Sequence, residues 1–132
     1  KNILEVLKKR YTSVNRIKFK GFIENKTMIE KIKTSQAVLL GTKMYEGQPT
    51  LITEAILHKT LVLSPSLGGM MEFFDDDTFL YTSGDYLDLT DKINTILDKT
   101  LVNKVVNNNF NYLNKKLSNI NLNQKFQEIV ND

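Results

Sequence analysis

The 132-residue sequence has the length of one compact domain, and its composition, 41% hydrophobic and 25% charged, is ordinary for a globular protein. It contains no cysteine and one histidine, His58, which excludes disulfides, a thiolate nucleophile or metal site, and a histidine metal cluster. No apolar run reaches the span of a bilayer and no segment resembles a signal peptide, so we expect a cytoplasmic protein.

The formal net charge of +3 conceals an uneven distribution of charge along the chain. The first 33 residues are strongly basic, whereas every charged residue from Glu72 to Asp91 is acidic. A basic amphipathic start can contact anionic lipid, which would place the protein at the inner membrane face, or it can simply be a solvated helix face, the simpler interpretation. We expect no nucleic-acid partner, because the basic residues come without a recognisable motif of base-stacking aromatics.

The first two thirds of the chain alternate helical and strand patterns. Leu4, Leu7 and Tyr11 give a first helix its apolar side, and the alternation in Ile17–Ile23 predicts a strand. Thr27 is the expected N-cap of the next helix. The following elements are predicted in this order: a strand at Gln36–Leu40, a loop at Gly41–Glu46, a helix at Pro49–Leu57, a strand at Thr60–Ser64, a short helix at Gly69–Phe74 and a strand near Phe79–Tyr81.

The last third of the sequence has three apolar stripes at helical spacing. The first begins after Asp85, which we expect to be its N-cap, and the other two include Phe110 and Phe126. We interpret the asparagines at Asn107–Asn109 as a turn.

Strands that alternate with single helices predict an α/β fold with a parallel sheet. In such a sheet ligands bind where loops leave the carboxyl ends of the strands. The loops at Gly21–Asn25, Gly41–Gly47 and Ser64–Gly69 therefore share one edge of the predicted sheet.

The segment Glu46–Glu54, EGQPTLITE, is the best candidate for a binding site. Pro49 suits a helix start, so the N–H groups of Gly47, Gln48 and Thr50 would face an open, partly positive helix end that can bind phosphate. Glu46 and Glu54 would bind hydroxyl groups on either side, as in a nucleotide-sugar. The alternative is that both acids only complement the helix dipole or lie on its surface.

This stretch resembles the retaining GT-B glycosyltransferases with two Rossmann-like domains and a Glu-x7-Glu signature (family 4-like, glycosyl transferases group 1). The resemblance covers about three quarters of the chain, from the strand-like Ile17–Phe22 through Glu46–Glu54 to Gly68–Glu72. It implies a Rossmann-like parallel sheet with helices on both faces, in the C-terminal half of a GT-B fold whose first strand is missing. Residues 1–132 would then be one nucleotide-sugar-binding domain, a fragment of a longer two-domain enzyme.

The resemblance also implies roles for individual residues. Glu46 would position the donor sugar as the catalytic residue, and Glu54 would bind the nucleotide ribose. Gly47, Gln48, Pro49 and Thr50 would flank the sugar and phosphate, and the loop of Phe22 and Ile23 would lie beside the base.

The implied function is hexosyltransferase-like transfer from a nucleotide-diphosphate sugar to a glycan or lipid-linked acceptor, which a missing N-terminal domain would bind. Family members transfer the sugar with retention and without an enzymic nucleophile, so we expect no cofactor and no metal. The isolated fragment should be inactive, and a composition rich in Lys, Asn and Ile hints at a bacterial origin. The alternative from another class is a non-catalytic Rossmann-like module for nucleotide binding or interaction.

Two other features have simpler explanations. Asp75–Asp77 could suggest a metal site, but a solvated acidic turn is the favoured interpretation. His58 lies at the predicted end of the Glu54 helix, where a cation complements the dipole, and this is favoured over a catalytic role.

Overall fold

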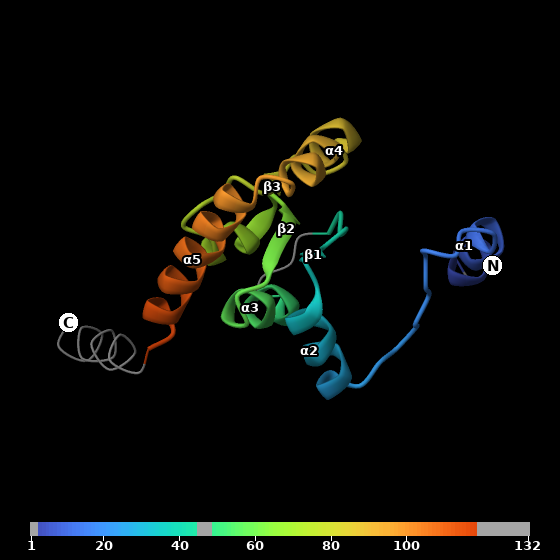
Figure 1. The fold of residues 1–132 in the computed structure, drawn as a ribbon, viewed down its shortest axis with the longest axis horizontal. Helices are drawn as coiled ribbons and strands as arrows, with labels where there is room; N and C mark the ends of the chain where they lie inside the picture. Colours follow the sequence, from blue (N-terminus) through green and yellow to red (C-terminus); the bar gives the residue numbers. More distant parts are fainter. Residues whose placement is uncertain (1–2, 45–48, 119–132) are drawn as a thin grey trace.

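A computed structural model describes residues 3–44 and 49–118 of the chain (Figure 1). Two consecutive helices come first, strands and helices then alternate, and two consecutive helices end the described chain. The elements are α1 (Ile3–Tyr11), α2 (Asn25–Thr34), β1 (Ala37–Leu39), α3 (Thr50–Leu57), β2 (Leu61–Pro65), the 3-10 helix η1 (Gly68–Phe73), β3 (Leu80–Tyr81), α4 (Tyr86–Thr95) and α5 (Lys99–Lys116).

The three strands form a parallel sheet in the order β1-β2-β3. Ala37 pairs with Leu61 at one end of the first ladder, and Ser64 pairs with Leu80 in the second. The parallel α/β architecture predicted from the sequence is therefore confirmed. All three strands end at the same edge, because parallel strands run in one direction.

Helices cover both faces of the sheet, as predicted. Val62 packs in one buried cluster with residues of α2 and α3, together with η1 and the C-terminal part of α5. Its neighbours Leu61 and Leu63 pack in another cluster with Val105 of α5. This alternation follows from the two-residue period of a strand, which sends successive side chains to opposite faces. Figure 1 shows the strands between α2 and α3 on one side and α4 and α5 on the other. Both faces of β2 are consequently buried.

The N-terminal segment differs from the prediction in two respects. Residues 17–23 form no strand, since β1, β2 and β3 make up the sheet of the described residues, and α1 stands apart from it (Figure 1). Alternation alone does not make a strand when no neighbouring strand supplies hydrogen bonds. Helix α2 begins at Asn25 after the N-cap Glu24, so Thr27 lies inside the helix and is not its cap.

In the C-terminal third, the predicted helix cap is confirmed and the predicted turn is wrong. Asp85 caps α4, because its side chain accepts hydrogen bonds from the N–H groups of Leu87 and Asp88. Asn107–Asn109 lie inside α5 and do not form a turn. Asn109 is buried there, so tertiary contacts outweigh the modest helix propensity of asparagine. The stripe that includes Phe126 lies outside the described residues.

The helices of the described residues include none that combines the length and apolar character needed to cross a bilayer.

Candidate functional site

Helix α3 begins at the carboxyl side of β1, where the sequence predicted a binding site. Pro49 is its N-cap, with φ of −70° and ψ of 111°, and makes no side-chain cap hydrogen bond. A proline side chain has no acceptor to offer, so Thr50 and Leu51 begin the helix with N–H groups that no cap side chain satisfies. Thr50 is exposed at this end. The helix dipole makes this end partly positive, but the predicted N–H groups of Gly47 and Gln48 lie outside the described residues, so the phosphate site stays a prediction.

Glu54 lies one turn further along α3 and is half-buried. Its carboxylate atom Oε2 is buried and has no hydrogen-bond partner, the one such side-chain atom found among the described residues. Buried polar atoms are normally satisfied, and an exception needs an explanation such as a bound ligand or water. Glu54, the residue predicted to bind a ribose, thus has a buried acceptor oxygen without a partner.

The other half of the predicted pair is not described. Glu46, Gly47 and Gln48 lie outside the described residues, so the predicted bracketing of the helix start by two acids remains a prediction.

Phe22 and Ile23, the predicted contacts to the base, precede helix α2. Phe22 is 97% exposed and Ile23 is half-buried. Gly21, just before them, has φ of +64°, a turn conformation that glycine adopts without strain. Helix α2 packs against α3, but no described hydrogen bond or core cluster brings Phe22 or Ile23 to Glu54. Their role beside the base also remains a prediction.

His58 is the C-cap of α3, and its N–H donates to the carbonyl oxygen of Glu54 at 3.1 Å. The helix then ends through Lys59, which has φ of +56°. The position is strained, because a positive φ favours glycine and a lysine occupies it. The lysine ammonium lies 4.6 Å from the centre of the Phe110 ring, a cation–π contact that ties the helix end to α5.

The acidic turn after η1 is more structured than the predicted solvated turn. Asp76 is half-buried, and its Oδ1 accepts hydrogen bonds from the hydroxyl and N–H of Thr78 at 2.6 and 3.2 Å. Its Oδ2 accepts a hydrogen bond from Asn108 at 3.2 Å. Burial alone would raise the pKa of Asp76, but the hydrogen bonds outweigh it and the pKa lies below its ordinary value of 3.8. The carboxylate is therefore engaged in holding its own turn.

No group of three or more His, Asp or Glu side chains arranged for a metal ion occurs in residues 3–44 and 49–118.

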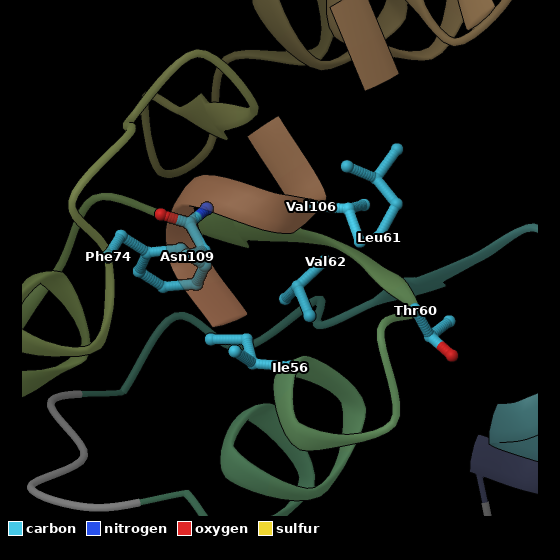
Figure 2. Close-up of a pocket in the computed structure, with 7 residues that line it drawn as sticks. All are labelled: Ile56, Thr60, Leu61, Val62, Phe74, Val106 and Asn109. Atoms are coloured by element: carbon cyan, nitrogen blue, oxygen red, sulfur yellow. The ribbon is translucent and has the colours of Figure 1, made fainter. Parts of the chain in front are cut away.

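Two cavities differ in size and place. The one in Figure 2 lies inside the core between Ile56, Val62 and Asn109, and its volume of about 10 Å³ leaves room for roughly one water. A second, of about 90 Å³, lies at the carboxyl edge of the sheet. It is lined by the loop after β1, by Tyr81 at the end of β3 and by the start of α4.

The second cavity was missed by sequence reasoning, although the rule that loops gather at the carboxyl edge could have indicated it. Ligand pockets usually measure about 300 to 1,000 Å³, so this cavity holds at most a part of a nucleotide-sized ligand.

A parallel sheet with helices on both faces defines a Rossmann-like α/β domain. The model of the family "Glycosyl transferases group 1" matches residues 2–115. The chain belongs to this family. No curated protein matches the sequence.

Three crystal structures of Alr3699/HepE from Anabaena share the fold. The complex with UDP-glucose has a TM-score of 0.76 and 24% sequence identity, and the match covers 98% of this chain and 36% of that one. The complex with UDP and glucose has a TM-score of 0.75 and 24% sequence identity, and the match covers 96% of this chain and 35% of that one. The complex with UDP has a TM-score of 0.76 and 24% sequence identity, and the match covers 98% of this chain and 36% of that one. This chain thus spans little more than a third of the HepE chain.

Proposed function

We propose that this chain is the donor-binding part of a retaining glycosyltransferase of the Glu-x7-Glu type. The enzyme transfers a sugar from a nucleotide-diphosphate sugar to a glycan or lipid-linked acceptor. The observation that carries the proposal is the buried, unpartnered Oε2 of Glu54 beside an uncapped helix start. Membership in a glycosyltransferase family and a fold shared with a protein crystallised with UDP-glucose support it.

Each part of the donor has a partner of fitting chemistry. A ribose hydroxyl donates to the free carboxylate oxygen of Glu54, which removes the cost of leaving that acceptor unsatisfied. The diphosphate lies at the start of α3, near Pro49 and Thr50, where N–H groups and the helix dipole favour negative charge. Glu46, with the main chain of Gly47 and Gln48, holds the sugar hydroxyls, and Phe22 and Ile23 lie beside the base.

The transfer step needs no enzymic nucleophile. The bond from the anomeric carbon to the leaving phosphate oxygen breaks, and the acceptor oxygen bonds to the same carbon on the same face. The acceptor's proton passes to the leaving phosphate oxygen. The domain then acts by positioning the donor and by stabilising charge on the departing diphosphate, which requires no metal.

A longer enzyme accounts for the rest of the activity. This chain covers 36% of the HepE chain, which leaves room for a second domain that binds the acceptor. By itself the 132-residue chain is inactive and binds the donor weakly.

Helix α1 is the element through which the enzyme contacts the inner membrane face. Ile3 and Val6 are 74% and 50% exposed, and Lys8, Lys9 and Arg10 follow them in its last turn. Co-sedimentation with anionic vesicles tests this, because replacing Lys8 and Lys9 by Glu should abolish binding. Equal binding to neutral and anionic vesicles would contradict it.

The test of the proposed function is a transfer assay on the full-length protein, with UDP-, GDP- and ADP-sugars as donors. Glu46→Gln should reduce transfer by at least about a hundredfold, because it removes a charged contact to the sugar. Glu30→Gln is the matched control, since Glu30 is exposed on α2 and pairs with Lys33. Transfer unchanged by Glu46→Gln would overturn the site. Nucleotide binding without transfer from any donor would favour the non-catalytic module instead.

A further inference from the structure

The 90 Å³ cavity at the carboxyl edge of the sheet lies between two elements that are distant in sequence. One wall is the loop after β1, at residues 41–43, the other is the start of α4, and Tyr81 at the end of β3 also lines it. Pro49, Thr50 and Glu54, the described contacts proposed for the donor, are not among the lining residues. A ligand in this cavity would therefore be a second ligand at the same edge of the sheet.

The α4 wall of the cavity is held in place by hydrogen bonds. Oδ1 of Asp85 accepts hydrogen bonds from the N–H groups of Leu87 and Asp88, both at 3.0 Å. Oδ2 of Asp88 accepts a hydrogen bond from the N–H of Thr82 at 2.7 Å, which ties the start of α4 to the residue after β3. Tyr81 is 6% exposed and belongs to the sheet. These two sides of the cavity are therefore formed before any ligand arrives.

An exposed aromatic ring stands at the cavity. Tyr86, the first residue of α4, lines the cavity and is nevertheless 70% exposed. The ammonium of Lys43 lies 6.0 Å from the centre of its ring, a cation–π contact between the two walls. Leu89 and the ring of Tyr81 add apolar surface to the lining. The cavity thus offers a flat aromatic face and an apolar interior to a ligand.

The polar groups of the lining include both a donor and an acceptor. The ammonium of Lys43 carries three N–H donors. Both described cap bonds of Asp85 go to Oδ1, so among the described contacts its Oδ2 remains an acceptor. A sugar ring has an apolar C–H face and a rim of hydroxyls that both donate and accept hydrogen bonds. An aromatic face beside an ammonium and a carboxylate matches this combination.

The same wall argues against a phosphate or another anion. The N–H groups of Leu87 and Asp88, which could bind an anion at the start of α4, already donate to Asp85. The carboxylates of Asp85 and Asp88 place two negative charges there, against the single ammonium of Lys43 among the lining residues. An uncharged ligand is therefore favoured.

We propose that this cavity is a subsite for one neutral sugar residue of a glycan acceptor. The sugar places its C–H face on Tyr86 and its hydroxyls against Lys43 and Asp85. A volume of about 90 Å³ takes part of the ring and leaves the rest in solvent, as a residue within a longer glycan requires. The inference rests on the proposed function, because a transferase must bind an acceptor beside its donor, and the second domain binds the remainder of that acceptor.

Saturation-transfer NMR on the full-length protein tests the subsite, with the methyl glycosides of glucose, galactose, mannose and N-acetylglucosamine as probes. At least one glycoside should receive saturation at its ring C–H protons, and Tyr86→Ala should weaken its binding about tenfold. Tyr86→Phe keeps the aromatic face and should bind within about twofold of the wild type. Leu87→Ala is the matched control, because Leu87 is the next residue, is 80% exposed and does not line the cavity. Glu54→Gln should also leave glycoside binding unchanged.

Competition in the transfer assay tests the acceptor role. The glycoside that binds should inhibit transfer competitively against the acceptor and not against the donor. Competition against the donor would overturn the inference, as would glycoside binding that is absent, equal in Tyr86→Ala and the wild type, or lost equally in Leu87→Ala.

The two proposals can fail separately. If Glu54→Gln weakens nucleotide binding while no glycoside binds through Tyr86, only the subsite fails. If no nucleotide binds and no donor is used, the proposed function fails. Glycoside binding that depends on Tyr86 would then belong to a sugar-binding module, which overturns the assignment to an acceptor.

Discussion

Asn109 of α5 binds both backbone groups of Asp76. Its Oδ1 accepts a hydrogen bond from the N–H of Asp76 at 2.8 Å, and its Nδ2 donates to the carbonyl oxygen of Asp76 at 3.1 Å. The same Oδ1 accepts a third bond from the N–H of Asp75 at 2.9 Å. A single buried amide in the middle of α5 therefore fixes the acidic turn that leads into β3.

Replacing Asn109 by Ala should destabilise the protein. The change leaves three backbone groups of the acidic turn without their partner, and we expect a loss of about 1–3 kcal/mol in the free energy of unfolding. Urea denaturation of the chain measures it. Asn107→Ala, an exposed position of the same helix, is the control and should change stability by no more than about 0.5 kcal/mol. Equal effects of the two substitutions would contradict the role of Asn109.

The stability contributed by Asp76 should depend on pH in one direction. Its folded-state pKa is lowered, so the unfolded state takes up the proton first and stability falls as pH decreases through 3.8. We expect the difference in unfolding free energy between the wild type and Asp76→Asn to be constant from about pH 7 to about pH 5 and to shrink below about pH 4. Urea midpoints across this range measure the difference. A difference that grows on acidification would be inconsistent with the hydrogen bonds to Thr78 and Asn108.

The end of α3 offers a test of backbone strain. Lys59 has φ of +56°, so Lys59→Gly should be more stable than Lys59→Ala by about 1 kcal/mol. Both variants lose the cation–π contact with Phe110, which makes their difference a measure of the backbone alone. Thermal unfolding of the two proteins under identical conditions provides the comparison. Equal stabilities would mean that the backbone relaxes at this position.

The sheet could be predicted from the sequence because its strands are short apolar runs between helix patterns. Leu61, Val62 and Leu63 are all buried, as a strand covered on both faces requires. Asp85 was equally predictable as a cap, because its chemistry is local and needs no tertiary contact.

The wrong predictions depend on tertiary contacts that no local pattern contains. Asn109 lies in a helix because its amide is satisfied by a turn more than thirty positions earlier. Residues 17–23 alternate like a strand but have no strand partner within the described residues.

Only part of the candidate site could be derived from the sequence. The helix start at Pro49 followed from the fixed φ of proline, but the unpartnered Oε2 of Glu54 depends on packing that the sequence does not display. Tyr81 was predicted only as part of a strand, because its bond to Leu40 spans an intervening strand.

Binding of nucleotide diphosphates to the chain itself tests the central claim most directly. Saturation-transfer NMR with UDP, GDP and ADP should show transfer to the ribose protons of at least one nucleotide. Glu54→Gln should weaken that binding about tenfold, because it removes a charged acceptor, whereas Glu30→Gln should leave it unchanged. Ribose signals of equal strength in Glu54→Gln and in the wild type would contradict the assignment of Glu54 to the ribose. No signal from any nucleotide at millimolar concentration would contradict donor binding by this domain.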